Sequence, residues 1–519
     1  MKNIKSILVA LVLTGSVAMT GCDPSDFGDI NVSPNSSSTA YTSMLFTGAC
    51  RYARNFIMTS STYDPWPAEW SGYLSEAKNN QYGPLGTTTN FGMGSYYLYA
   101  IKNMNLIIEM NENEEINNTV PVTAFGDNNN QIAVAKTLRA FFFMTLTDIL
   151  GPLPYDEAFQ GESMDNWKPA FNSQEEIYTK LNDDLVDAFS KMDPSSNLSD
   201  NDLFFGGNVA KWKKFNASLR MMLAIKLADV DPVNGKARFA KAFADGGMTN
   251  TDDSFCYTYD EKTSYSWMYA VGNMTYDAKN NWFGPNKVIV DALKEYKDPR
   301  MFVYFTIGDD AYLGKRDGNP NDFEAYIGLP FGLESNAAVA EIKNVACSVA
   351  QRYCQKNAKN GLITTARTLL VEAEAATLGW INADASALYE AGIRSSFEFE
   401  GAADVDEYIA AHPLPETKAE ALHEIVMQRF LAGFMMDGIE SWSDWRRYNI
   451  PTLPIYQGQV DAGNLSYPCR LSYSDSDVQY NMKNTTDAIQ KWLGGNDDTL
   501  TRLWWDVADN ECPLAPGVK

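Results

Sequence analysis

The chain has 519 residues, with 42 Lys and Arg against 66 Asp and Glu, which gives a formal net charge of −24. Apolar residues make up 45 % and charged residues 21 %, an ordinary globular composition that excludes wholesale disorder. Because phosphates need a basic footprint, the acidic balance argues against a nucleic-acid-binding protein. With only two histidines, the chain cannot form a His-rich metal centre and has little material for Ser-His-Asp or Cys-His catalysis.

The first 21 residues have the pattern of a secretory signal peptide. A short basic start precedes an apolar run over 7–12, which is too short to span a membrane. The segment 19–22, Met-Thr-Gly-Cys, resembles a bacterial lipobox, in which cleavage precedes the cysteine and its thiol is lipidated. We therefore predict a signal peptide over 1–21 and a lipid anchor on Cys22 that holds the mature chain to a membrane. An ordinary signal peptide with an incidental cysteine is the alternative.

Helical periodicity recurs along the rest of the chain. Apolar residues spaced by three or four predict helices over 40–58, 93–112, 128–150, 174–192, 209–230, 285–297, 362–378, 384–398, 422–434 and 477–493. Ser173, followed three residues later by Glu176, predicts a capping box at the start of one of them. Strand signals are confined to 255–259 and 301–306. The sequence thus predicts a mainly α protein, a tetratricopeptide-like helical superstructure with degenerate repeats, and one unit over 22–519.

Long irregular stretches separate these helices, at 59–90, 260–285, 308–334 and 449–475. Unstructured connections of this length inside a folded protein are uncommon and usually functional. They are rich in Trp, Tyr, Asn and Asp, and helix periodicity does not explain their aromatic residues.

The predicted ligand-binding site is a shallow surface platform built from two segments of these stretches, 63–82 and 265–282. Aromatic rings suit the C–H faces of a pyranose because they are rigid, apolar and have little rotamer entropy to lose. The predicted binding residues are Trp66, Trp70, Tyr82, Tyr265, Trp267, Tyr269 and Trp282. Trp66 and Trp70 are four residues apart, so the alternative is that they cover the end of a helix.

A resemblance to a known family becomes specific at 148–158, Asp-Ile-Leu-Gly-Pro-Leu-Pro-Tyr-Asp-Glu-Ala, where a helix ends at a glycine and a proline. This segment resembles the SusD/RagB family of outer-membrane nutrient-binding lipoproteins. Further pieces occur in the family's order over most of the mature chain, at 212–220, 298–301, 372–375, 379–380, 389–396, 424–425, 445–447 and 504–506. These motifs form the fold, and no ligand-binding residue is carried over from them.

The resemblance implies a SusD-like α-helical fold on tetratricopeptide-type helices. It also implies a lipid-anchored protein at the cell surface of a Bacteroidetes outer membrane, which covers a SusC-like TonB-dependent transporter and delivers captured nutrients to it. Members of the family capture oligosaccharides, and some capture peptides. The loop composition favours a glycan, and a peptide-binding groove stays open as the alternative.

Catalytic carboxylates are hard to single out among 66 acidic residues. A glycoside hydrolase needs two that flank the scissile bond. Glu372 and Glu374 are two apart on a predicted helix and should face different sides, while Asp183 and Asp184 lie in an acidic helix and should face solvent. The arginines of 445–447 are expected to pair with carboxylates inside the protein. We therefore expect a binding protein and not an enzyme.

No cofactor is predicted. Asp317, Asn319 and Asn321 alternate like a calcium loop, but the EF-hand pattern fails because Asp322 stands where glycine is needed and Gly328 where glutamate is needed. A structural calcium ion in another geometry stays open. The cysteines show no CxxC pattern, so the sequence does not predict zinc.

Overall fold

The computed structural model describes residues 40–54, 66–76, 91–161, 165–262, 283–308, 318–332, 341–342, 345–436, 438–455 and 466–507. By its contacts, the chain from Thr42 onwards makes up one unit, and every element named below belongs to it. The signal peptide predicted over 1–21 and the lipidated Cys22 lie outside the described residues, so both stay predictions. Among the described helices, none is both long and apolar enough to cross a membrane.

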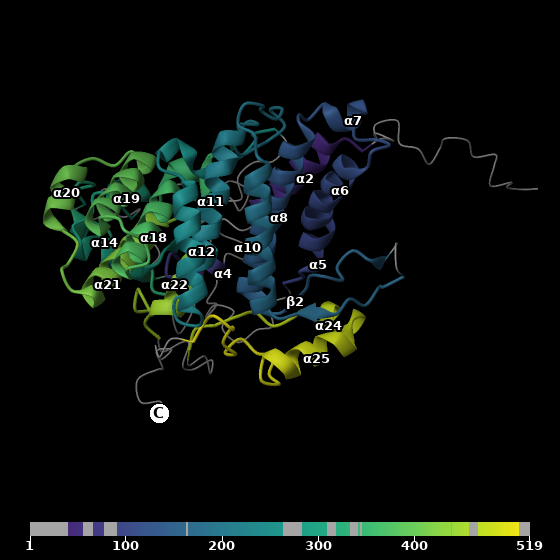
Figure 1. Cartoon of the computed structure of the whole chain (residues 1–519). Coiled ribbons are helices and arrows are strands. Elements are labelled where there is room, and N and C mark those ends of the chain that lie inside the picture. Colours follow the sequence, from purple (N-terminus) through teal and green to yellow (C-terminus); the bar gives the residue numbers. More distant parts are fainter. Residues whose placement is uncertain are drawn as a thin grey trace, which may run out of the picture. The chain divides into compact units, whose positions relative to one another are not determined.

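Helices account for most of the described structure (Figure 1). In the first half they are α2 (Thr42–Ala53), α4 (Trp66–Trp70), α5 (Gly94–Tyr96), the π-helix η2 (Tyr97–Ile101), α6 (Lys102–Glu112), α7 (Val120–Thr123), α8 (Asn128–Leu150), α10 (Gln174–Lys191), α11 (Val209–Ile225), α12 (Pro232–Asp245) and the 3-10 helix η3 (Thr251–Asp253). In the second half they are α14 (Lys287–Glu295), α15 (Met301–Tyr304), the 3-10 helices η4 (Phe323–Ala325) and η5 (Gln351–Cys354), α18 (Thr365–Thr377), α19 (Ala385–Glu400), α20 (Val405–Ala411), α21 (Lys418–Ala432), α22 (Gly438–Tyr448), α24 (Asp475–Tyr480) and α25 (Met482–Trp492).

The longer helices stack side by side in chain order. Helix α8 packs against α6 and α10, α11 packs against α12 and α18, and α18 packs against α19 and α21. Figure 1 shows this succession running from α6 to α19. It is the predicted mainly α fold, in which each helix pair covers the apolar face of the next.

Local signals set the ends of these helices. The Asp127 side chain accepts a hydrogen bond from the backbone N–H of Asn130 at the start of α8, and Gly151 ends that helix with a φ of 88°. At the start of α10, Ser173 and Glu176 form the predicted capping box.

The strands are short and pair in four two-stranded antiparallel sheets. The pairs are β1 (Leu74–Glu76) with β5 (Phe283–Pro285), β2 (Leu153–Pro154) with β3 (Phe171–Asn172), β4 (Phe255–Thr258) with β8 (Lys359–Ile363), and β6 (Phe305–Thr306) with β7 (Ser348–Val349). Each sheet therefore joins segments that are distant in the sequence or fastens a connection between helices.

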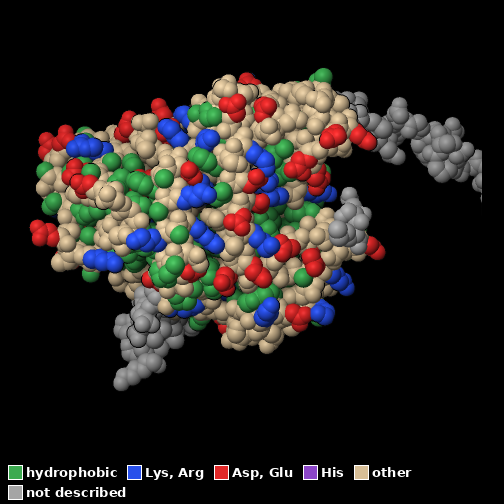
Figure 2. Space-filling model, in the orientation of Figure 1, with side chains coloured by type: hydrophobic (Ala, Val, Ile, Leu, Met, Phe, Trp, Pro, Cys, Tyr) green, Lys and Arg blue, Asp and Glu red, His purple; other side chains and the backbone are tan. Residues whose placement is uncertain are grey.

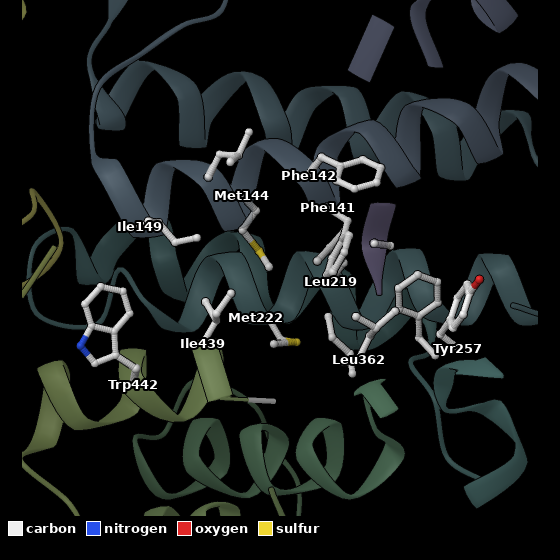
Figure 3. Close-up of a cluster of buried hydrophobic side chains, with 14 of the residues drawn as sticks. Phe141, Phe142, Met144, Ile149, Leu219, Met222, Tyr257, Leu362, Ile439 and Trp442 are labelled. Carbon is white, nitrogen blue, oxygen red and sulfur yellow. The ribbon is translucent and has the colours of Figure 1, made fainter. Parts of the chain in front are cut away.

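The main core lies between α8, α11 and α22 (Figure 3). Helix α8 is buried on more than one side, because Phe141, Phe142 and Phe143 are at most 4 % exposed although they point in successive directions around the helix. Figure 3 labels the buried side chains Phe141, Phe142, Met144 and Ile149 of α8, Leu219 and Met222 of α11, Ile439 and Trp442 of α22, Tyr257 of β4 and Leu362 of β8.

Two predicted elements differ from the structure. The strand predicted over 301–306 is extended only at Phe305–Thr306, because Met301–Tyr304 forms the helical turn α15. Just before this turn, the Asp298 side chain accepts a hydrogen bond from the backbone N–H of Arg300. The helix predicted over 477–493 is divided at Asn481, whose φ of −131° and ψ of 40° separate α24 from α25. No helix was predicted where the structure has α4, α7, α12, α20 and α22.

Candidate functional site

Two of the seven predicted binding residues, Trp66 and Trp70, lie inside the core. Both side chains are 0 % exposed and both belong to the short helix α4. Their ring centroids are 4.7 Å apart, and Trp442 of α22 packs against both at 5.3 and 5.5 Å. Rings enclosed in this way offer no free face to a ligand. The prediction that Trp66 and Trp70 belong to a surface platform is wrong for this structure, because both rings are buried against α22.

The other five predicted residues stay a prediction because they lie outside the described residues. They fall into the segments 77–90 and 263–282, and they are Tyr82, Tyr265, Trp267, Tyr269 and Trp282. What the structure does describe is the place where both segments are attached to the fold.

The antiparallel sheet β1–β5 joins the two segments at one end. Its register pairs Leu74 with Pro285 and Glu76 with Phe283. Segment 77–90 follows directly after Glu76, and segment 263–282 leads directly into Phe283. Two aromatic-rich segments that are almost 200 residues apart in the sequence are therefore attached to neighbouring positions on one sheet. The sequence alone gave no sign of this pairing, because strand partners this far apart leave no local pattern.

The sheet is firmly anchored in the core next to β1. Tyr73 stacks on Phe430 of α21 with ring centroids 5.0 Å apart and an angle of 5° between the rings. Its hydroxyl donates to the Phe430 carbonyl at 2.8 Å and forms a hydrogen bond with the hydroxyl of Ser441 at 2.7 Å. On the β5 side, the backbone N–H of Asn286 donates to the Tyr73 carbonyl at 2.9 Å. These contacts give the two segments a fixed base.

A cavity of about 550 Å³ lies between α14, α21 and the segment 451–454. Its lining includes Lys287, Asp291, Tyr296, His423, Met427 and Pro451. The Tyr296 hydroxyl donates to the Glu424 carboxylate at 2.8 Å, and Lys287 pairs with Asp291 one turn further along α14.

The motif residues behind the family resemblance form buried ion pairs. The Glu374 carboxylate accepts hydrogen bonds from Arg447 at 2.8 Å and from Arg429. Burial alone would raise the pKa of Glu374, but Arg429 and Arg447 outweigh it and lower that pKa. As predicted, Glu372 faces elsewhere, toward Gly247, and burial raises its pKa to about 8. The two carboxyl groups therefore do not converge on one reacting bond.

A second buried cluster surrounds Asp148, the first residue of the motif 148–158. The Lys226 ammonium lies 2.6 Å from the Asp148 carboxylate and 2.9 Å from that of Glu440. Trp505 donates its indole N–H to Asp148 at 2.9 Å, and the Tyr178 hydroxyl donates to the same oxygen. Side chains of α8, α10, the end of α11 and the C-terminal region thus meet at the Asp148 carboxylate, and α22 joins the cluster through Lys226. The role of Asp148 in this motif is structural.

The described residues contain no group of three or more His, Cys, Asp or Glu side chains placed to hold a metal ion. Asp317, the first residue of the calcium-like pattern, lies outside them. The five cysteines that the structure describes are buried and form no disulfide among themselves, namely Cys50, Cys256, Cys347, Cys354 and Cys469.

Comparison with known proteins agrees with this fold. Residues 34–474 match the SusD-like family described as starch-binding and associating with the outer membrane. Because the match covers most of the chain, the protein belongs to this SusD-like family. No curated protein matches the sequence.

Solved structures with the same fold include the following three. A chitin-binding protein is 24 % identical, with 90 % of this chain and 99 % of that chain covered and a TM-score of 0.72. A SusD homologue from Bacteroides fragilis is 24 % identical, with 90 % and 100 % covered and a TM-score of 0.74. A chitin-binding SusD homologue from Flavobacterium johnsoniae is 22 % identical, with 90 % and 97 % covered and a TM-score of 0.68. These likenesses confirm the SusD-like helical fold.

Proposed function

We propose that the protein is a non-catalytic, lipid-anchored receptor that captures oligosaccharides at the outer-membrane surface and passes them to a SusC-like TonB-dependent transporter. The family match supports the glycan class, since the family is described as starch-binding and two structural relatives are named as chitin-binding. An anchor on Cys22 would place the protein at the surface but gives no route across the membrane, so an imported ligand needs a channel.

The observation that carries the proposed site is the β1–β5 register. It attaches the segment with Tyr82 and the segment with Tyr265, Trp267, Tyr269 and Trp282 to neighbouring positions of one anchored sheet. Aromatic rings from both segments could therefore cover a single saccharide, with Asn and Asp side chains of the same segments bonding its hydroxyls. We place the main ligand site on these five residues and no longer on Trp66 or Trp70.

The ligand class is tested by calorimetric titration of the mature protein with starch and chitin oligosaccharides and with a peptide pool. The proposal predicts saturable binding of at least one saccharide, which is recovered uncleaved after incubation. Binding of peptides alone would favour the peptide-capturing alternative, and turnover of the saccharide would show an enzyme. For the partner, gentle detergent extraction with a tag on this chain should co-purify a large outer-membrane β-barrel protein, whereas recovery of the lipoprotein alone would count against the transporter.

A further inference from the structure

A second cavity, of about 520 Å³, lies within the helical array between α6, α8, α10 and the segment that follows β2. Its volume falls in the roughly 300–1,000 Å³ range of small-molecule sites. Of the two predicted platform residues that the structure describes, Trp66 and Trp70, neither lines it. The lining consists of Asn105, Ile108, Glu109, Arg139, Phe143, Tyr155, Asp156, Ala158, Phe159, Lys180, Asp183 and Asp184. Figure 2 shows acidic, basic and apolar side chains mixed over the face that carries these helices.

The polar wall of this cavity is already assembled. Arg139 of α8 donates to the Asn105 side chain of α6 at 2.7 Å and to the Asp184 carboxylate of α10, also at 2.7 Å. The Tyr155 hydroxyl donates to the same Asp184 oxygen at 3.0 Å. The prediction that Asp184 simply faces solvent is therefore wrong, because Arg139 and Tyr155 reach it from neighbouring elements. Both partners of the ion pair are still partly accessible, with 19 % of the Arg139 and 25 % of the Asp184 side chain exposed.

Burial, with Asp184 next in effect, raises the pKa of Tyr155, so its hydroxyl keeps its proton and stays a hydrogen-bond donor. Three helices and the segment after β2 hold these donors and acceptors in place before any ligand arrives. Such pre-organisation lowers the entropy lost when a ligand binds.

The apolar wall is aromatic and holds one strained residue. The rings of Phe143 and Tyr155 are 4.6 Å apart, and Phe159 stacks on Tyr97 at 5.7 Å. Tyr97 is itself fixed, because its hydroxyl donates to the Pro154 carbonyl at 2.5 Å. Phe159 has a φ of 69°, in the left-handed region that bulky side chains rarely adopt. Strain of this kind persists where surrounding contacts enforce it, and it is concentrated at ligand sites.

The charges of the lining indicate the class of ligand. The lining has four carboxylates and two cationic side chains, so its net negative charge would repel an anionic ligand. The central Arg139–Asp184 ion pair offers both hydrogen-bond donors and acceptors to hydroxyl groups. We propose that this cavity is a second saccharide site, which binds a neutral mono- or disaccharide unit through the Arg139–Asp184–Tyr155 cluster and the ring of Phe159. The proposal rests on the proposed function, since it takes the protein to be a saccharide receptor.

The test uses the mature protein and two neutral probes, maltotriose and N,N′-diacetylchitobiose, in calorimetric titrations. The double variant Trp267→Ala/Trp282→Ala first weakens the predicted platform, so that binding at the cavity can be measured alone. In this background we expect binding to remain and to weaken about tenfold or more on adding Tyr155→Phe and Asp184→Asn, because the ligand hydroxyls lose an assembled donor and acceptor. Asp187→Asn is the matched control, since Asp187 is an ion-paired carboxylate on the same helix that does not line the cavity.

Hydrogen exchange locates the site independently of the substitutions. Saturating probe should slow exchange in 102–112 and 155–161 of the platform variant, and glucuronate should not. Saccharide binding that the platform variant abolishes, with no protection in these segments, would overturn the second site and leave the proposed function standing. Residual binding that Tyr155→Phe and Asp184→Asn do not change would also overturn it. A wild-type protein that binds neither these probes nor any other oligosaccharide would overturn both proposals.

Discussion

The indole rings of Trp66 and Trp442 pack edge to face in the core, with centroids 5.3 Å apart and an interplanar angle of 80°. Trp442 is also held by a hydrogen bond, since its N–H donates to the Pro468 carbonyl at 2.8 Å. We expect Trp66→Ala to lower the free energy of unfolding by about 3–5 kcal/mol, because it leaves a large cavity in a well-packed cluster. Chemical denaturation measures this change.

Trp167→Ala serves as the control for that experiment, because 68 % of Trp167 is exposed. Its free energy of unfolding should stay within about 0.5 kcal/mol of the wild type. At a temperature where Trp66→Ala is still folded, its saccharide affinity should equal that of the wild type. A stable Trp66→Ala variant with weakened saccharide binding would show that this residue belongs to the ligand site after all.

Breaking the Lys226–Asp148 pair should be strongly destabilising. Lys226 is 3 % exposed, and burial alone would lower its pKa, but Asp148 and Glu440 outweigh that effect and raise it. Lys226→Ala leaves two buried carboxylates without their cation, so we expect a loss of about 3–5 kcal/mol in the free energy of unfolding. Lys483→Ala, which removes one partner of an exposed pair with Asp487, should cost at most about 0.5 kcal/mol. Equal effects of the two substitutions would contradict the structural role of this cluster.

Burial of Glu372 should make the free energy of unfolding fall as the pH rises. Its pKa is about 8 in the folded protein against an ordinary value of 4.5, because the carboxyl group is buried. Between these two values the folded state binds more protons than the unfolded state, so Glu372 makes stability fall as pH rises from about 4.5 to about 8. Glu372→Gln should remove this contribution and stabilise the protein at pH 8 by on the order of 2–4 kcal/mol.

The measurement is a series of denaturation curves from pH 5 to pH 8, with Glu407→Gln as the control at an exposed position. The control should follow the wild-type profile. If the free energy of unfolding of Glu372→Gln changes with pH in parallel with that of the wild type, the Glu372 carboxyl group is not held neutral by burial.

The anchor prediction concerns Cys22. Intact-mass analysis of the membrane-extracted protein should find a mature chain that begins at Cys22 and carries acyl mass on it. Cys22→Ala should release the protein from the membrane, because it removes the residue on which the predicted acyl anchor is built. Unchanged membrane retention of Cys22→Ala would show that the protein is held in another way.

Local signals allowed part of the fold to be predicted. Helix α8 has its predicted bounds, 128–150, because Asp127 at its start and Gly151 at its end act within a few residues of the helix. The strand predicted at 301–306 is extended only over Phe305–Thr306, because Met301–Tyr304 forms a helical turn that follows the Asp298–Arg300 hydrogen bond. Periodicity therefore predicts the array of helices well, and it fails where a single polar side chain redirects the backbone.

The candidate site was harder to predict because its contacts are non-local. Nothing near Trp66 shows that Trp442 covers it, and nothing near Asp184 shows that Arg139 of another helix pairs with it. The pairing of Glu76 with Phe283 likewise depends on the folded chain. Aromatic residues in irregular segments are thus a useful sign of a binding site, but the sequence cannot separate the rings that face a ligand from those that fill the core.

The central claim is that the main saccharide site lies on the two segments attached to β1 and β5. Its most direct test compares the wild type with Trp267→Ala/Trp282→Ala in calorimetric titrations, using the oligosaccharide that the wild type binds most tightly. Thermal denaturation of the same samples shows whether each variant is folded. We predict that the variant keeps its melting temperature and loses the tighter binding event, with about 2 kcal/mol or more of binding free energy lost at a central aromatic residue. Unchanged affinity in a folded variant would contradict the account and place the saccharide site away from the segments joined by β1 and β5.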